Sequence, residues 1–408
     1  MKSALILFSG FCALPAFADL RVSTDFEGGS ATVDSIDEGR REIRIRPGGD
    51  PARGWPCWWF VRIEGIGKGE AATLVLRGSE RPARNNGQDT GKPLSPSWAM
   101  PAAAAISEDG VTWRHTELGK RATDHIAYPL VGGDGPLWVA WGPPFTSRET
   151  DSLIDATSRL RPEIVKAFEL ARTREGRPVR GLRIAGPGSE DRPVVWVQAR
   201  QHAWESGASW VARGLVEWVL GEEKEAVRLR EIAEIHVIPI MDVDRVATGD
   251  GGKESDPRDH NRDWTDSPHY PEVAATQKKL LAFAGENRLA VFLDLHNPGA
   301  NDRRPFFFVG PPELLPDLAR SNRERFLSFA EARLDAPLSL EPAPRVTGAG
   351  YHPLWRQISG QWVNEHGNPF TMAACLETSW NTPHSTAAGY LSVGAKLGRA
   401  LSDFLNSR

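Results

Sequence analysis

Two histidines and one glutamate occupy positions suited to binding a metal ion. His202 and Glu205 stand three residues apart after the apolar run 193–199, and His296 follows the apolar run 289–295. Side chains at the ends of neighbouring strands can converge on one cation and leave a fourth position open for water. A His-x-x-Glu pair alone is a weak signal, but two histidines with one glutamate are typical of hydrolytic zinc sites. We therefore predict one zinc ion per chain.

Two further segments carry groups that suit hydrolysis. The guanidinium of Arg262 can bind a carboxylate through two hydrogen bonds, and Asn261 is a neighbouring donor. Glu377 follows the apolar run 371–376, so we expect it to project from a strand end, as His296 does. A partly desolvated carboxylate at such a place is suited to act as a general base.

The elements that must position these residues alternate between strand-like and helix-like segments from about residue 146 to the C-terminus. Apolar runs of buried-strand length occupy 193–199, 235–240 and 289–295. Helical periodicity is predicted over 150–172, 206–220 and 272–285. This alternation predicts an α/β catalytic domain over 146–408.

The preceding part of the chain has a different pattern. Between residues 20 and 142, short alternating or aromatic runs are separated by Gly, Pro and Asp-Gly, and no helical stripe of useful length is present. Such a pattern is typical of two packed antiparallel sheets. We therefore predict an all-β sandwich over 19–145.

The first 18 residues have the order of a cleavable secretory signal. Met1-Lys2 precedes an apolar run over 4–14, and Ala16-Phe17-Ala18 resembles a cleavage site. We expect cleavage after Ala18 and export to the periplasm or the extracellular space. The apolar run is too short to cross a bilayer, and no later segment approaches the roughly 20 residues required, so we expect no membrane anchor.

Charge and cysteine content limit the binding partners and the kind of stabilisation that we expect. The 49 basic and 53 acidic residues give a formal charge of -4, so no global electrostatic attraction to nucleic acid is expected. Outside the predicted signal only Cys57 and Cys375 remain, which excludes a disulfide framework and favours two buried free thiols. Stability must then come from ordinary hydrophobic cores.

Taken together, the motifs resemble the zinc carboxypeptidases, in particular their cytosolic-carboxypeptidase-type branch. The matching segments follow the family's order: Gly176-Arg177-Pro178, Gln201-His202 with Glu205-Ser206 and Ser209-Trp210, Asn261-Arg262 with Trp264, Asp294-Leu295-His296, and Glu377. The stretch from 25–29 to 138–141 is similar to that branch's N-terminal β-domain. The resemblance implies a mixed, mainly eight-stranded sheet flanked by helices, with zinc at the strand ends. It also implies hydrolysis of a C-terminal peptide bond by a metal-activated water, with Glu377 as general base.

The chain departs from the family at two places. Relatives carry an arginine shortly before the Asn-Arg pair, where this chain has Gly251-Gly252-Lys253. Lys253 could supply the positive charge that an oxyanion requires, with Arg245 and Arg258 as rival donors and a solvated loop lysine as the alternative. The family's cleft tyrosine has no clear counterpart, and Tyr351 is the nearest candidate.

Three functions remain open at this point. The first is exopeptidase action on a peptide or protein with a free C-terminal carboxylate, which Asn261 and Arg262 would recognise. The second is a zinc amidohydrolase that acts on cell-wall peptides or N-acyl amino acids with the same ligands. The third is a binding module that has lost catalysis, which the retention of His202, His296 and Glu377 disfavours.

Overall fold

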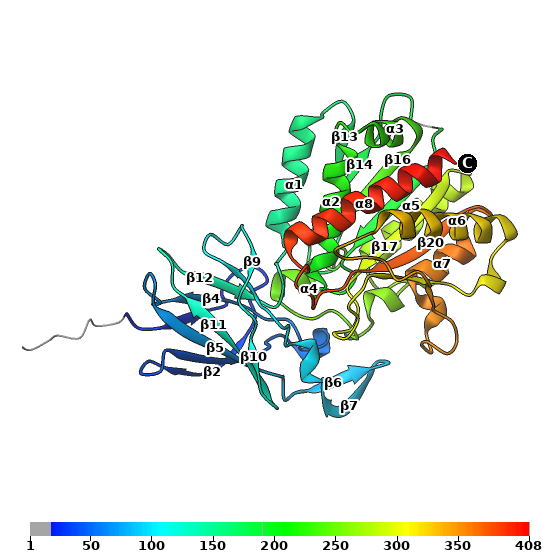
Figure 1. Cartoon of the computed structure of the whole chain (residues 1–408). Coiled ribbons are helices and arrows are strands. Elements are labelled where there is room, and N and C mark those ends of the chain that lie inside the picture. The colour runs from blue at the N-terminus through cyan, green and yellow to red at the C-terminus, as the bar shows by residue number, and fades with distance from the viewer. Residues whose placement is uncertain (1–17, 190, 408) are drawn as a thin grey trace, which may run out of the picture.

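The computed structural model describes residues 18–189 and 191–407, and they form an N-terminal β region beside an α/β region (Figure 1). The predicted signal peptide lies outside the described residues except for Ala18. None of the described helices combines the length and the apolar character needed to cross a lipid bilayer.

The N-terminal region contains two five-stranded sheets. One has the order β1 (Arg21–Ser23), β4 (Phe60–Glu64), β12 (Leu137–Ala140), β8 (Ala105–Ser107) and β9 (Arg114–His115). The other has the order β10 (Lys120–Arg121), β11 (His125–Val131), β5 (Ala71–Arg77), β3 (Glu42–Arg46) and β2 (Thr32–Asp37). One hydrophobic cluster includes residues of both sheets, because alternate side chains such as Ile43 and Ile45 of β3 point inward. A separate ribbon, β6 (Pro82–Asn85) and β7 (Gln88–Pro93), extends beneath the α/β region in Figure 1.

The α/β region is built on one mixed sheet of eight strands. Its order is β13 (Val165–Arg172), β14 (Pro178–Ile184), β16 (Glu234–Ile238), β15 (Val194–Ala199), β17 (Leu289–His296), β20 (Met372–Glu377), β18 (Phe306–Val309) and β19 (Arg345–Val346). The central strands β16, β15, β17 and β20 run parallel and are almost wholly buried, which explains their continuous apolar sequences. The expected α/β architecture with an eight-stranded mixed sheet is confirmed.

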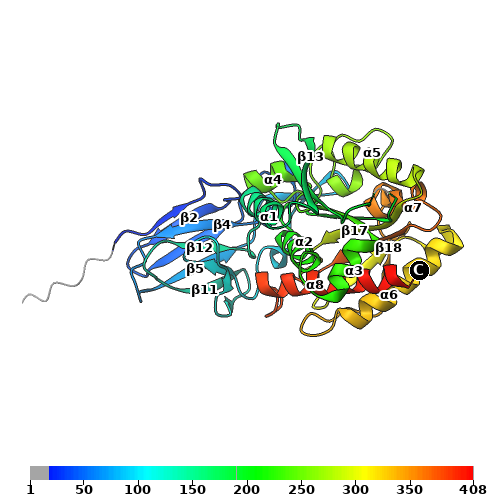
Figure 2. The same cartoon turned by 90° about the horizontal axis from the view of Figure 1, so that it is seen from above.

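Helices cover both faces of this sheet (Figures 1 and 2). One face is covered by α2 (Ser206–Val219), α3 (Lys224–Ile232), α6 (Asp317–Arg333) and α8 (Ala387–Asn406). The other face is covered by α5 (Pro271–Gly285) and α7 (Ser359–His366), and α4 (Val243–Thr248) follows β16. Helices α2 and α8 pack closely because Gly214 and Gly394 lie where any Cβ would strike the facing backbone. The predicted helices over 206–220 and 272–285 are therefore present.

The predicted helix over 150–172 is wrong in its second half. Helix α1 (Ser147–Leu160) begins after Thr146, whose backbone N–H donates to Glu149 Oε2 at 2.7 Å. It ends before Pro162, because a proline disfavours helical backbone at the residue that precedes it. Residues Val165–Arg172 instead form β13, which pairs with β14.

Candidate metal centre and active site

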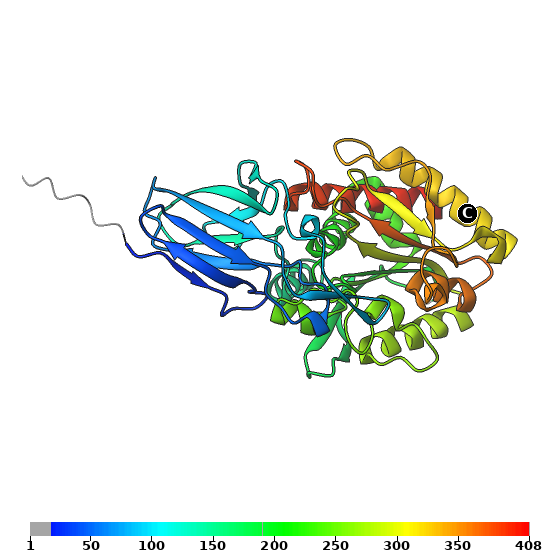
Figure 3. The same cartoon turned by 90° about the horizontal axis from the view of Figure 1, so that it is seen from below.

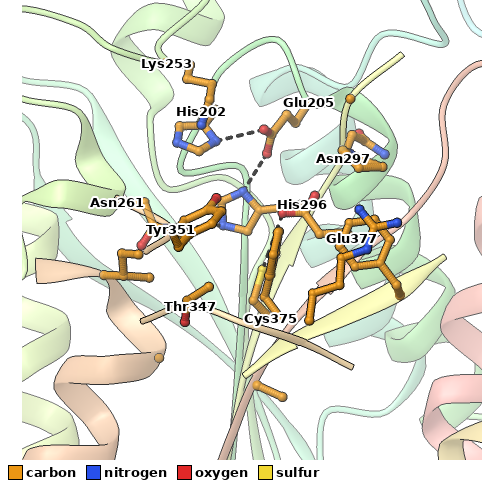
Figure 4. Close-up of a pocket in the computed structure, with 18 of the residues that line it drawn as sticks. His202, Glu205, Lys253, Asn261, His296, Asn297, Thr347, Tyr351, Cys375 and Glu377 are labelled. Atoms are coloured by element: carbon orange, nitrogen blue, oxygen red, sulfur yellow. Dashed lines mark hydrogen bonds and ion pairs between the residues drawn. The ribbon is translucent and has the colours of Figure 1, made fainter. Parts of the chain in front are cut away.

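The candidate site lies at the carboxyl ends of three adjacent parallel strands. His296 is the last residue of β17 and Glu377 the last residue of β20, and the two are paired across the sheet. His202 follows β15, the neighbour of β17 on its other side. Parallel strands bring their carboxyl ends to one edge, so residues far apart in the sequence meet here (Figure 4).

A tight turn presents His202 and Glu205 on one side. Arg200 adopts a left-handed backbone with φ of 67°, which a non-glycine residue keeps only where the surroundings fix it. Its buried guanidinium donates to the carbonyls of Ala203 at 2.7 Å and Phe145 at 3.0 Å. Burial lowers the pKa of Arg200 to about 9. The turn is thus held by its own buried arginine, and Glu205 stands directly before α2.

Three donor atoms converge at this edge of the sheet. His202 Nδ1 lies 2.8 Å from Glu205 Oε1, and His296 Nδ1 lies 2.7 Å from Glu205 Oε2. The three donors lie within 4.8 Å of one another, and all three residues are buried. Both imidazoles therefore turn the same nitrogen toward one point beside the carboxylate (Figure 4).

The opposite ring nitrogens face two buried carboxylates. His202 Nε2 lies 3.1 Å from Asp259 Oδ1, and His296 Nε2 lies 3.1 Å from Asp294 Oδ2. Metal-binding histidines usually donate their second N–H to such a partner, which fixes the tautomer and the ring orientation. Two Nδ1 atoms and one carboxylate oxygen, with both outer nitrogens satisfied, fit a three-ligand zinc site.

The surroundings shift the pKa values of the two carboxyl groups at this site in opposite directions. Burial favours the neutral form of Glu205, but the two histidines outweigh it and lower the pKa of this carboxyl to about 2. Burial also raises the pKa of Glu377 to about 7, although His296 opposes the shift. Glu377 Oε2 has no hydrogen-bond partner in the described part of the chain. The site therefore holds Glu205 as an anion, whereas the pKa of Glu377 lies near neutral pH, as proton transfer requires.

The segment that contains Asn261 and Arg262 lies beside the histidines. Asp259 accepts the backbone N–H of Asn261 at 2.7 Å and so caps the short turn His260–Arg262. Arg262 donates from Nη1 to the carbonyl of Asn261 at 2.8 Å and from Nε to His352 Nδ1 at 3.3 Å. Its Nη2 atom makes no hydrogen bond within residues 18–189 and 191–407. Asn261 and Arg262 line the same cavity as the histidines.

The structure separates Lys253 from its rival cations. Lys253 and Tyr351 both line the cavity with His202 and Glu377. Arg245 instead donates to Tyr270 Oη at 2.8 Å, and Arg258 lies 3.4 Å from Asp263, so both are engaged away from the cavity. All eight residues expected at the site are thus brought together around one cavity.

Several cavity residues were not expected from the sequence. Trp98 reaches the cavity from the N-terminal region, and Thr347 and Arg345 reach it from the segment after α6. His352, which contacts Arg262, carries no local motif. Asp259, the carboxylate partner of His202, stands two residues before the Asn261-Arg262 pair. Its place next to that pair was the signal in the sequence that could have identified it.

Comparison with known proteins relates part of the chain to a known family. Residues 150–278 match the family model described as zinc carboxypeptidase, and this stretch contains His202, Glu205, Asn261 and Arg262. Within this stretch the chain is similar to the zinc carboxypeptidases. His296 and Glu377 lie beyond the matched stretch, and the sheet brings them to the same edge.

Individual relatives extend this likeness. Bovine cytosolic carboxypeptidase 3 is 27% identical over 225 residues, which are 50% of this chain and 21% of the relative. Human cytosolic carboxypeptidase 6 is 21% identical over 303 residues, which are 72% of this chain and 60% of the relative. The chain therefore matches less than two thirds of either relative. A metallo-carboxypeptidase from Burkholderia cenocepacia shares the fold with a TM-score of 0.77 and 20% identity, over 95% of this chain and 100% of that one.

Proposed function

We propose that the protein hydrolyses the C-terminal peptide bond of peptides or proteins, with one zinc ion bound by His202, Glu205 and His296. One observation carries this proposal: a metal-ligand cluster, a carboxyl with a raised pKa and an arginine with a free donor edge line one cavity. Hydrolysis of a bond next to a carboxylate needs these three components in one place.

Arg262 is suited to bind the free carboxylate of the substrate. Two of its nitrogens are engaged by Asn261 and His352, which leaves Nη2 for a ligand in the cavity. His352 Nδ1 also accepts the backbone N–H of Leu354 at 2.9 Å, so the ring proton must be on Nε2. The guanidinium is therefore fixed in direction before the substrate arrives, which reduces the entropy lost on binding. Tyr351, the next residue to His352, is 43% exposed and is placed to cover the bound end.

The remaining residues supply proton transfer and positive potential. When bound, zinc would polarise water and the scissile carbonyl. Glu377 accepts a proton from the attacking water and later delivers it to the leaving amine, and its raised pKa suits both steps. Lys253 adds positive potential for the oxygen that becomes negative.

The chain's organisation belongs to the same proposal. We assign residues 1–18 to a signal peptide that is removed on export to the periplasm or the extracellular space. Residues 19–145, whose two sheets share one core, form a β-sandwich, and residues 146–408 form the catalytic domain. N-terminal sequencing of the exported protein tests the cleavage site, and a mature chain that retains the apolar run 4–14 would contradict it.

Metal analysis of single variants tests the ligand assignment. His296→Ala removes one of three ligands and should leave far less than one zinc per chain. His236→Ala is a matched control, because His236 is also buried and paired with a carboxylate, Glu234, at 2.7 Å, yet does not belong to the cluster. Zinc content should be unchanged in the control. Full zinc content in His296→Ala would contradict the assignment.

A further inference from the structure

A segment of the N-terminal region is bound along the loop that carries Lys253. Trp55 N–H donates to the carbonyl of Lys253 at 2.9 Å, and Gly252 N–H donates to the carbonyl of Arg53 at 2.9 Å. The backbones approach so closely that a Cβ on Gly54 would strike Gly252. Two segments almost 200 residues apart thus pair like short strands.

Side chains reinforce this pairing at one end. Arg53 Nε donates to Asp250 Oδ2 at 2.6 Å, and the backbone N–H of Asp50 donates to Asp250 Oδ1 at 2.7 Å. At the other side of the loop, the backbone N–H of Trp204 donates to the carbonyl of Gly251 at 3.1 Å. Because Trp204 stands between His202 and Glu205, the loop joins the N-terminal region directly to the metal-ligand turn.

The side chain of Lys253 has an unusual environment. Its ammonium makes no hydrogen bond or ion pair to any described residue, and it lies 5.4 Å from the centre of the Trp55 ring. An indole face attracts a cation without neutralising its charge, unlike a carboxylate. The contact with Trp55 can therefore hold the ammonium in place without neutralising its charge, while the buried carboxylate of Asp259 attracts it from a distance.

We infer that Trp55 is a positioning residue that holds the Lys253 ammonium beside the metal cluster, which makes the N-terminal region part of the hydrolytic site. The inference rests on the oxyanion role proposed above for Lys253. The indole itself is fixed on two sides, since Nε1 donates to the carbonyl of Arg84 at 2.8 Å and the ring meets Trp98 edge-on at 4.8 Å. Trp98 in turn lines the cavity. Figure 3 shows the blue and cyan strands reaching the α/β region from one side.

Paired variants of Trp55 separate ring position from overall folding. Trp55→Leu keeps an apolar side chain but removes the aromatic face, whereas Trp55→Phe keeps a smaller aromatic face and loses the bond to Arg84. Trp138→Ala is the matched control, because Arg62 lies 5.6 Å from that ring in the same region but outside the cavity. We expect Trp55→Leu to lower kcat by roughly threefold to thirtyfold, the range that a partly desolvated cation–π contact supports. Zinc content, and kcat in Trp55→Phe and Trp138→Ala, should remain near wild type.

A double-mutant cycle tests whether Trp55 acts through Lys253. In a Lys253→Ala background, Trp55→Leu should change kcat by less than about twofold, because the group it positions is gone. The same loss of kcat in both backgrounds would overturn the inference and leave the proposed function standing. A wild-type kcat in Lys253→Ala would overturn the role of Lys253 itself, and the inference with it.

A spectroscopic measurement on the metal-free protein is independent of turnover. Lysines are dimethylated with carbon-13, and the Lys253 signal is identified by its absence in Lys253→Arg. The ring current of Trp55 should displace this signal, so it should move in Trp55→Leu and remain in place in Trp138→Ala. A Lys253 signal that is identical in wild type and Trp55→Leu would overturn the inference.

Discussion

Replacing Asp259 by asparagine removes the charge of the carboxylate that fixes the His202 ring. Asp259 Oδ1 lies 3.1 Å from His202 Nε2, and Asp259 Oδ2 accepts the backbone N–H of Glu254 at 2.9 Å. Burial would raise the pKa of Asp259, but His202 outweighs it and holds this pKa well below its usual range, so the group is an anion in the native protein. An asparagine cannot accept on both sides at once, because one of its two terminal groups is a donor.

The expected cost follows from the number of contacts that are lost. A hydrogen bond from a ligand histidine to a partner of this kind typically contributes tenfold to a hundredfold in metal affinity, which is about 1.4 to 2.7 kcal/mol. The net contribution of a hydrogen bond to a charged group, roughly 1.5 to 3 kcal/mol, lies in the same range. We therefore expect the zinc Kd of Asp259→Asn to rise by about tenfold to a hundredfold.

Competition with a chromophoric chelator at neutral pH measures this Kd. Glu272→Gln is the matched control, because Glu272 is equally buried and lies 2.7 Å from His260, a histidine outside the cluster. Its zinc Kd should remain within about twofold of wild type. If Asp259→Asn also remains within about twofold, then this carboxylate does not support the metal site and the ligand geometry described above is wrong.

Three further predictions concern the proton carrier, the carboxylate pocket and acid stability. Glu377→Gln should retain zinc while kcat falls by roughly two to four orders of magnitude, and near-normal turnover would place the base elsewhere. Arg262→Ala should abolish the preference for free over amidated peptides, whereas His352→Ala should raise KM by about threefold to tenfold with little change in kcat, as loss of one hydrogen bond predicts. Burial alone would raise the pKa of Glu234, but hydrogen bonds from His236 and Arg183 outweigh the effect of burial and lower this pKa. The stabilising contribution of the Glu234 carboxylate is therefore complete above pH of about 5 and is lost as the pH falls below about 4. The urea midpoints of wild type and Glu234→Gln should differ at pH 7 and converge at low pH. An equal difference between the two midpoints at both pH values would refute this prediction.

The parts of the site that the sequence predicts are those whose signal is local. His202, His296 and Glu377 each follow an apolar run, and a run of that kind becomes a buried strand with its end at the edge of the sheet. The order of the strands then brings the three residues together. Pro162 marks the end of α1 in the sequence. The apolar residues after Pro162 continue the helical spacing, however, and so the predicted helix extends too far.

The contributions of Trp55, Trp98 and His352 have no such signal. Trp55 and Trp98 lie more than 100 residues before His202 in a region of β strands, where tryptophans normally serve as core. The place of Trp98 at the cavity and the place of Trp55 beside Lys253 depend on how the two regions pack, which composition and periodicity do not encode. His352 contacts Arg262 across 90 residues, and only the tertiary fold brings them within 3.3 Å.

Peptide cleavage by the metal-free and zinc-reconstituted protein tests the proposed zinc-dependent hydrolysis of the C-terminal peptide bond. One peptide is supplied with a free C-terminus and, in parallel, with an amidated C-terminus, and the products are identified by mass spectrometry. We predict that only the zinc-reconstituted protein releases the last residue, and only from the free peptide. Equal cleavage of both peptides would favour the amidohydrolase alternative, and cleavage that does not depend on zinc would contradict the account of the site.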